Sequence, residues 1–189
     1  MVQAPAKSLT LDAFLALPDT QPASEFVDGR ISQKPMPQGQ HSRLQLDLSK
    51  LIDSAVRDPK IACAFPELRC SFGGHSIVPD IAVVTWDRIP VLENGNVANV
   101  FSLAPDWIIE ILSPEQSPTK VTKKILRSLQ HGSKMGWLIV PEDESVFVYR
   151  SHREVEVYDS ESGETSLPVP DFMSEFSLSI EELFGLLKL

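Results

Sequence analysis

The sequence lacks the features that mark membrane-spanning, secreted and nucleotide-cofactor proteins. No apolar run approaches the roughly 18 residues that a membrane span requires. Residues 1–9 hold no apolar stretch of the signal-peptide type, so we expect a cytoplasmic protein without a membrane partner. A phosphate-binding loop, a dinucleotide-binding glycine pattern, a Cys-x-x-Cys pair and a nucleophile elbow are absent as well. The two cysteines, Cys63 and Cys70, are predicted to be buried thiols and not zinc ligands.

Basic residues are also scarce for a protein that binds nucleic acid. Lys and Arg number 17 against 26 Asp and Glu, which gives a net charge of −9. The excess of acid lies in residues 142–189, however, and residues 1–141 are balanced. A local basic patch can bind phosphates on an acidic molecule. The net charge therefore does not decide the matter, because the balanced part contains a basic group formed by Lys120, Lys123, Lys124, Arg127 and Lys134.

Length and hydrophobic pattern predict one domain over residues 1–189, with the acidic segment 142–189 as part of it. The predicted fold is a mixed α/β sheet with helices packed on it. Helices are expected at 11–17, 41–57, 120–131 and 180–187, with Thr10, Thr119 and Ser179 as N-caps and Gly132 after the third. A hairpin turning at Asp28-Gly29 is expected at 25–31, strands at 61–65, 68–72, 77–85, 106–112, 137–140, 146–149 and 155–158, and a loop at 87–102.

Two of the predicted strands each carry a carboxylate that is out of place in an apolar run. Asp80 stands at the entrance of the apolar run 78–84, and Glu110 lies inside the run 106–112. Period-two alternation places Glu110 on the same face as Ile108 and Leu112, so it cannot simply face water. A buried carboxylate is costly unless it is compensated, and a hard cation such as Mg²⁺ is a strong compensator. The alternative for Asp80 is a solvent-facing turn residue after Pro79.

Four further residues have two interpretations each. The helix at 120–131 follows the Glu110 strand, so its first turns can return over that strand's end, and its apolar stripe is formed by Val121, Ile125, Leu126 and Leu129. Lys123 and Lys124 flank the stripe equally, and either lysine alone is explained by a solvated helix face. His41 shares a face with Leu44 and is either a hydrogen-bonded core histidine or a site residue. Glu25 is either a third acid of the site or a charge at a strand end.

Taken in order, these residues resemble the Uma2 (Uma-two) family of bacterial proteins, which are restriction endonuclease-like members of the PD-(D/E)xK nuclease superfamily. The resemblance runs from about residue 11 to residue 149. It is carried by Glu25, Asp28-Gly29, Pro37, Gly39, His41, Pro79-Asp80, residues 107–114, Lys124 eight residues before Gly132, and residues 137–140.

The resemblance implies a restriction endonuclease-like fold, with a central four- or five-stranded mixed sheet flanked by helices. It implies that Asp80 and Glu110 hold Mg²⁺ or Mn²⁺ and that Lys124 is the catalytic lysine. Glu25 and His41 match accessory positions near the same cleft. The implied activity is metal-dependent cleavage of DNA, and a homodimer is compatible with it. The DNA backbone would be held, with strong salt dependence, by Lys120, Lys123, Arg127 and Lys134.

The chain differs from most nucleases of the superfamily at one position and from the family pattern at three. Leu112 stands where most nucleases of the superfamily have lysine, Ser128 where the family usually has tyrosine, Lys120 where an acid is usual, and Pro141 where aspartate is common. One alternative is therefore a non-catalytic nuclease-fold protein that binds nucleic acid or a protein partner. A third is an interaction domain whose acidic segment docks a basic partner, although it leaves Glu110 unexplained.

Overall fold

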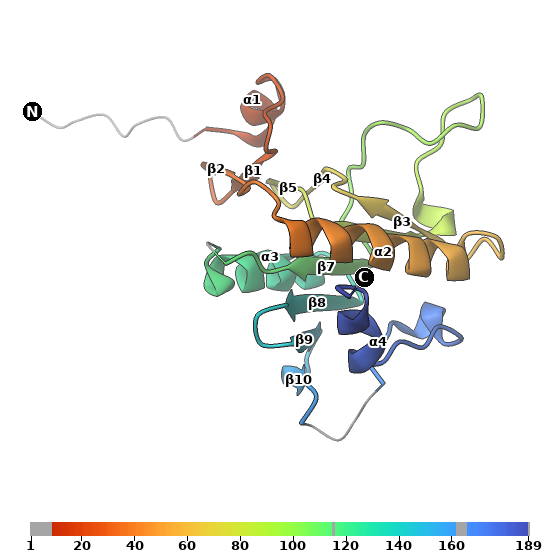
Figure 1. Cartoon of the computed structure of the whole chain (residues 1–189). Coiled ribbons are helices and arrows are strands. Elements are labelled where there is room, and N and C mark those ends of the chain that lie inside the picture. Colours follow the sequence, from red (N-terminus) through yellow and green to blue (C-terminus); the bar gives the residue numbers. More distant parts are fainter. Residues whose placement is uncertain (1–8, 115, 162–165, 189) are drawn as a thin grey trace, which may run out of the picture.

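The computed structural model describes residues 9–114, 116–161 and 166–188, and it has a mixed α/β fold (Figure 1). Its two sheets are joined through the segment that contains Asp80. The predicted fold class is confirmed, but the strands divide between two sheets instead of forming one. Within the part of the chain described, no helix is long and apolar enough to cross a membrane.

The smaller sheet is antiparallel, with strand order β2-β1-β5-β4. The predicted hairpin is β1 (Ser24–Val27) and β2 (Arg30–Gln33), and its turn residues Asp28 and Gly29 both have positive φ, as a tight hairpin turn requires. Helix α1 (Leu11–Leu15) is capped by Thr10 as predicted, and its Phe14 ring stacks on Phe26. The remaining strands are β4 (Cys70–Phe72) and β5 (His75–Ile77).

The larger sheet has six strands in the order β10-β9-β8-β7-β6-β3. The resemblance implied four or five. The pair β7–β8 is parallel and the other pairs are antiparallel, which makes the sheet mixed. The extra strands come from the acidic segment, which contributes the outer hairpin of the sheet. The strands are β3 (Ala62–Pro66), β6 (Ile81–Thr85), β7 (Trp107–Ile111), β8 (Met135–Val140), β9 (Ser145–Arg150) and β10 (Glu156–Tyr158).

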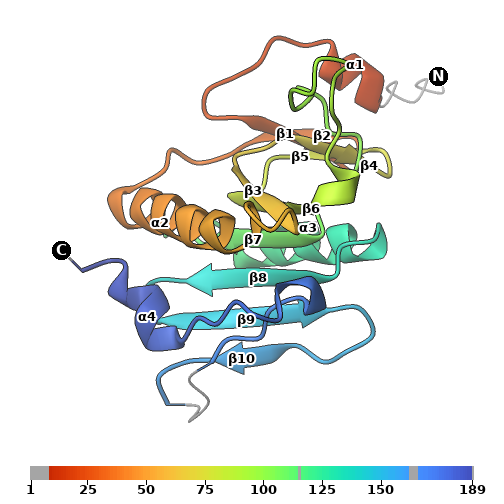
Figure 2. The same ribbon diagram turned by 90° about the vertical axis from the view of Figure 1, so that its right-hand side faces the viewer.

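Helices cover both faces of the larger sheet (Figure 2). Helix α2 (Gly39–Val56) and the capped terminal helix α4 (Ile180–Gly185) pack on the face that carries Ile109 and Trp137. Helix α3 (Pro118–Gln130) packs on the face that carries Ile108. A Cβ at Gly136 of β8 would lie 2.3 Å from the Ile125 side chain, so the close approach of α3 to the sheet requires glycine there.

Several expected boundaries are wrong, each for a local reason. The N-cap of α3 is Ser117, and Thr119 lies inside the helix, because Pro118 is favoured in a first turn. The expected strand 77–85 is broken into β5 and β6, since Pro79 has no N–H to continue a ladder. Loop 87–102 begins with a 3-10 turn (Trp86–Arg88) and contains a bridge between Val91 and Val97, and a second 3-10 turn spans Asp171–Met173.

Candidate functional site

The break between β5 and β6 places Asp80 where the two sheets meet. Its side chain is 1% exposed, and both of its carboxylate oxygens are engaged. Oδ1 accepts a hydrogen bond from Lys34 Nζ at 2.7 Å, and Oδ2 accepts one from the Ile111 backbone N–H at 2.7 Å and lies 3.1 Å from His41 Nε2. The solvent-facing alternative for Asp80 is therefore wrong, and the residue lies directly against the end of β7.

Glu110 occupies the neighbouring position on β7 and is equally buried, at 1% exposure. The pairing of Ile81 with Ile109 and of Ala82 with Ile108 brings Asp80 and Glu110 side by side on adjacent strands. Glu110 Oε2 lies 2.8 Å from Lys124 Nζ, whereas Oε1 is buried without a hydrogen-bond partner among the residues that the structure describes. A buried carboxylate oxygen without a partner destabilises the fold, so a ligand bound to Oε1 would offset this cost.

Lys124 is the lysine of α3 that reaches the two acids. Its Nζ contacts Glu110 Oε2 and also Glu25 Oε1, the latter at 2.9 Å, whereas Lys123 is exposed. The choice of Lys124 over Lys123 is thus the one that the geometry supports. The expected stripe is wrong at Leu126, which is 42% exposed, because α3 turns Lys124 and Ser128 toward the sheet in its place.

Glu25 belongs to the cluster and does not point into solvent. It lies in β1, and its Oε1 accepts hydrogen bonds from Lys124 Nζ and from the backbone N–H of Val78 at 2.8 Å. This second contact ties the smaller sheet to the strand break beside Asp80. The alternative of a mere strand-end charge is therefore wrong for Glu25.

His41 is in the first turn of α2, buried as predicted, and its Nε2 faces Asp80. His41 Nδ1 is buried without a partner. The histidine thus belongs to the cluster by contact, in addition to lying against the core with Leu44.

Lys34 is a member of the cluster that the sequence pattern does not reveal. It follows β2 in an irregular stretch, where no periodicity marks a residue as inward-facing. Its buried ammonium group donates to Asp80 Oδ1, to the Val78 backbone carbonyl at 3.1 Å and to Glu67 Oε1 at 3.4 Å. The sequence carries no signal for this residue, because the pairing of β1 with β5 that brings it to Asp80 forms only in the folded structure.

The mutual contacts set the charge state of the cluster. Burial raises the pKa of Glu110 to about 8; the nearby Lys124 ammonium opposes this effect and the Asp80 carboxylate adds to it. Burial acts on Asp80 in the same direction, but the hydrogen bond from His41 and the Lys34 ammonium outweigh it and hold the pKa of Asp80 well below its ordinary value. Burial alone would lower the pKa of Lys124, yet the carboxylates of Glu110 and Glu25 raise it.

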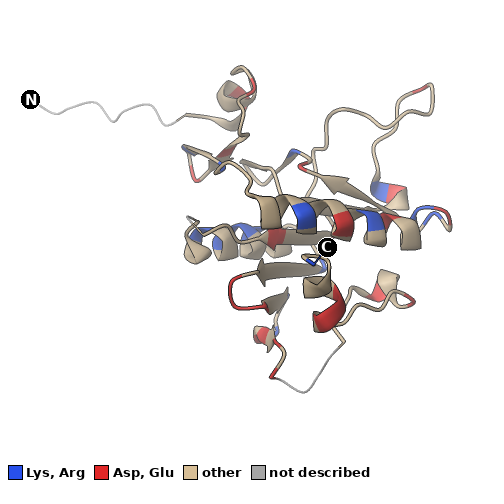
Figure 3. Cartoon of the chain, in the orientation of Figure 1, with Lys and Arg blue, Asp and Glu red and all other residues tan. Residues whose placement is uncertain are grey.

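The other basic residues of the predicted patch lie outside the cluster. Lys120 and Lys123 are exposed on the first half of α3. Figure 3 shows basic residues, in blue, along the ribbon of this helix, and acidic residues, in red, at the β8–β9 turn and in α4. Arg127 is half-buried and paired with Asp28 of the hairpin turn. Lys134 directly precedes β8, so it lies at the opposite end of α3 from the first turns.

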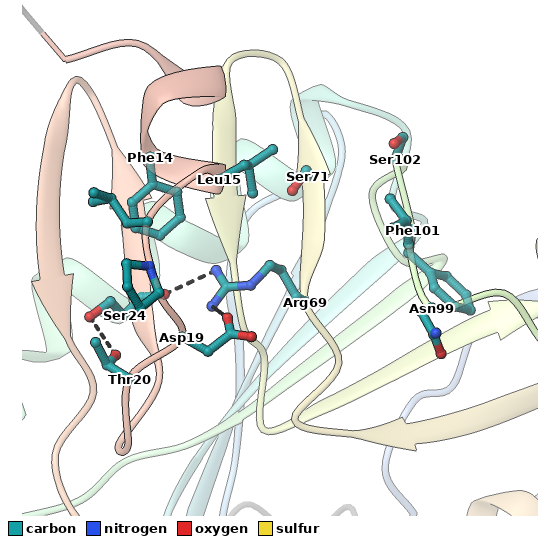
Figure 4. Close-up of a pocket in the computed structure, with 13 residues that line it drawn as sticks. Phe14, Leu15, Asp19, Thr20, Ser24, Arg69, Ser71, Asn99, Phe101 and Ser102 are labelled. Atoms are coloured by element: carbon teal, nitrogen blue, oxygen red, sulfur yellow. Dashed lines mark hydrogen bonds and ion pairs between the residues drawn. The ribbon is translucent and has the colours of Figure 1, made fainter.

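A separate cavity of about 270 Å³ lies between α1, the smaller sheet and residues 99–102 (Figure 4). Arg69 points across it toward Asp19 and donates to the Ser24 backbone carbonyl at 3.0 Å. Its lining includes none of the ionisable residues around Asp80 and Glu110. This cavity therefore belongs to a different part of the molecule from the carboxylate–lysine cluster.

The donor set fits a hard divalent cation better than zinc. Within the described residues, no group of three or more His, Cys, Asp and Glu is arranged to hold a metal ion, so a closed zinc site does not fit. Mg²⁺ needs fewer protein ligands, because it keeps water and takes substrate phosphate with one or two carboxylates. The adjacent carboxylates of Asp80 and Glu110, of which Glu110 Oε1 is unpaired among the described residues, match this requirement.

The mixed sheet with helices on both faces, and the buried carboxylate–lysine cluster beside its central strand β7, match the restriction endonuclease-like fold that the resemblance implied. The chain belongs to the Uma2 family, described as "putative restriction endonuclease", whose model matches residues 11–181. The crystal structure of a "putative nuclease belonging to DUF820" from Anabaena variabilis is 57% identical, with a TM-score of 0.91, over 95% of this chain and 99% of that one. Among curated proteins, none matches the chain. Family and neighbour together support a nuclease role.

Proposed function

We propose that this protein is a DNA endonuclease that uses Mg²⁺ or Mn²⁺ to hydrolyse phosphodiester bonds. The observation that carries the proposal is the buried Glu110 Oε1, which lies beside Asp80 and has no partner among the described residues. The other oxygen of the same carboxylate contacts Lys124. Asp80 and Glu110 would hold the cation. When bound, such an ion activates water and offsets the negative charge that develops on the attacked phosphate.

The residues of the chain divide the remaining tasks. Lys124 is held at its fixed position by Glu110 and Glu25, so its ammonium can stabilise negative charge on a phosphate or orient a water molecule. Glu25 is a positioning residue, because its Oε1 joins Lys124 to the backbone of Val78. His41 fixes Asp80 through Oδ2.

The exposed lysines of α3 would hold the DNA backbone. Lys120 and Lys123 stand on the turns of α3 that precede and include Lys124, so phosphates bound there would lie close to the cluster. Arg127 would first have to leave Asp28, and Lys134 is farther along the chain beyond the helix. Contacts of this kind predict binding that weakens steeply with salt. We expect a homodimer from the resemblance alone, and light scattering after gel filtration tests it.

A non-catalytic nuclease-fold protein is the second candidate, and a specific observation favours it. Ser128 stands at the family's tyrosine position, and its hydroxyl donates to the Lys124 backbone carbonyl at 3.1 Å. It therefore bonds its own helix and contributes no contact to the acids. If a tyrosine hydroxyl is needed at this position, the cluster would be a remnant that serves stability and binding only.

Cleavage of plasmid DNA separates the two candidates. The parent should nick or linearise supercoiled plasmid in Mg²⁺ or Mn²⁺ and not in EDTA, and Glu110→Gln should abolish this activity. Single-stranded DNA and RNA of the same length test the substrate class. DNA binding without cleavage under every metal condition would favour the non-catalytic candidate.

A further inference from the structure

Lys34 is bound as tightly into the cluster as Lys124, although no pattern in the sequence assigns it a role. Its side chain is 6% exposed. Its three ammonium protons match three acceptors, namely Asp80 Oδ1, the Val78 carbonyl and Glu67 Oε1. A lysine desolvated to this degree is costly to fold, so the charge of Asp80 must compensate it.

The contacts of Asp80 decide which of its oxygens could bind a cation. Oδ2 is occupied by the Ile111 backbone N–H and by His41, both of which belong to elements of the folded core. Oδ1 is occupied by the Lys34 ammonium alone. A divalent cation shared by Asp80 and Glu110 would therefore have to take Oδ1, where Lys34 now is.

We infer that Lys34 is a built-in counter-cation, which neutralises Asp80 in the metal-free protein and leaves Oδ1 when a divalent cation binds. This inference rests on the proposed function, because it assumes that Asp80 and Glu110 take Mg²⁺ or Mn²⁺. A side chain that leaves Oδ1 still needs an acceptor. Glu67 provides one, since its side chain is 52% exposed and its backbone N–H is bonded to the Asp80 carbonyl at 3.2 Å.

A lysine that competes with the metal and a lysine that only stabilises the fold should respond differently to substitution. Removing a competing cation should tighten divalent-metal binding, because the metal no longer has to displace an ammonium group. The same change should weaken the metal-free fold, because Asp80 is left buried with less compensation. A structural lysine would weaken the fold without tightening metal binding.

The test measures Mn²⁺ affinity without DNA, from the electron paramagnetic resonance signal of free Mn²⁺. The parent, Lys34→Met and the control Lys50→Met are compared, since Lys50 is exposed on α2 and loses the same charge. Lys34→Met should bind Mn²⁺ about tenfold tighter or more, as expected for a charge removed from a poorly screened position. The Mn²⁺ affinity of Lys50→Met should stay within about twofold of that of the parent. Lys34→Arg keeps the positive charge and should bind Mn²⁺ with the affinity of the parent.

Thermal unfolding gives the second readout. In EDTA, Lys34→Met should melt below the parent, and saturating Mn²⁺ should raise its melting temperature by more than it raises that of the parent. If Lys34→Met does not fold, nitrogen NMR of the lysine ammonium groups in the parent replaces it. The Lys34 signal, assigned through Lys34→Arg, should then shift on addition of Mg²⁺.

The outcomes distinguish the inference from the function on which it rests. A parent that binds Mn²⁺ together with a Lys34→Met variant of equal or weaker affinity overturns the counter-cation inference alone. An unchanged Lys34 signal in a parent that binds Mg²⁺ does the same. If neither the parent nor Lys34→Met binds a divalent cation, the proposed metal-dependent function fails along with the inference.

Discussion

Strand β7 has a buried carboxylate near each end, and the two carboxylates differ in how they are satisfied. Asp106, directly before the strand, is bonded on both oxygens: Oδ1 to Arg88, and Oδ2 to the backbone N–H and hydroxyl of Thr85 at 2.9 and 3.0 Å. Glu110, near the other end, has Lys124 on one oxygen and no partner on the other.

Because both acids are buried and only their partners differ, burial alone does not identify a functional acid. Asp106 is as inaccessible as Glu110, yet both of its oxygens are bonded within the fold, so it is a structural residue that holds loop 86–104 against the sheet through Arg88. Glu110 is left with capacity that the fold does not use. Variants of the two residues should therefore change different properties of the protein.

The largest expected effect is on catalysis. If the protein cleaves DNA, Lys124→Ala should reduce turnover by about 10²–10⁴-fold, because an ammonium placed against developing charge acts in the transition state. Its metal affinity should not fall below that of the parent, because the ammonium does not coordinate the cation and its buried charge repels it. Turnover is measured on plasmid DNA at saturating Mg²⁺.

The matched control for this prediction is Lys123→Ala, one residue earlier on the same helix and exposed. It should retain turnover at saturating DNA. Equal losses of turnover in the two variants would contradict the assignment of Lys124 and would favour the non-catalytic candidate.

The second prediction concerns Asp106. Asp106→Ala should destabilise the protein by about 3–5 kcal/mol, because it leaves Arg88 and the Thr85 N–H without their buried acceptor. Urea unfolding in EDTA measures the change. The folded variant should bind Mn²⁺ as the parent does, and a loss of metal affinity there would break the distinction between the two carboxylates.

The third prediction is a gain in stability, in contrast to the loss expected for Asp106→Ala. The pKa of Glu110 is raised to about 8 in the folded protein, from an ordinary value of 4.5. Between these values the folded state holds a proton that the unfolded state lacks, so this group makes the fold less stable as pH rises through the window. Glu110→Gln cannot ionise and should be more stable than the parent by on the order of 1–3 kcal/mol at pH 9.

Melting curves in EDTA between pH 4 and pH 9 test this prediction. The difference between Glu110→Gln and the parent should be small at the acid end and should grow through the window. A variant that melts below the parent at pH 9 would show that the Lys124 contact, and not burial, dominates the energy of Glu110.

The smallest expected effect is on DNA binding. Lys123→Ala should weaken the complex by a few-fold at low salt, and the loss should shrink as salt rises, with the slope of log K against log salt reduced by about one. Fluorescence anisotropy at several salt concentrations measures it. A loss that does not depend on salt would rule out a backbone phosphate contact.

Glu110 could be predicted from the sequence because alternation constrains it, whereas the role of Asp80 followed from the resemblance. Glu110 shares a face with Ile108, and this parity follows from the spacing of the two residues alone. A helical wheel could not predict whether Lys123 or Lys124 is buried. It identifies the buried face of a helix from its apolar residues, and here a charged residue lies on that face. The wrong placement of Leu126 has the same cause, because the contacts of Lys124 with two carboxylates decide which side of α3 is buried.

The residues that escaped prediction are brought together by tertiary structure alone. Lys34 lies in a segment without periodicity, and it reaches Asp80 because the smaller sheet folds against the strand break. The break itself is hidden in the sequence because residues 77–85 form one nearly continuous apolar run. Only the absence of an N–H at Pro79 marks the point where the chain passes from one sheet to the other.

Calorimetric titration with Mn²⁺ of the metal-free parent, Glu110→Ala and Asp106→Ala tests the central claim most directly. The account predicts that the parent binds, that Asp106→Ala binds alike, and that Glu110→Ala loses about tenfold or more in affinity, because it lacks one of the two carboxylate ligands. A Glu110→Ala variant with the affinity of the parent would contradict the assignment of Asp80 and Glu110 as a divalent-metal site.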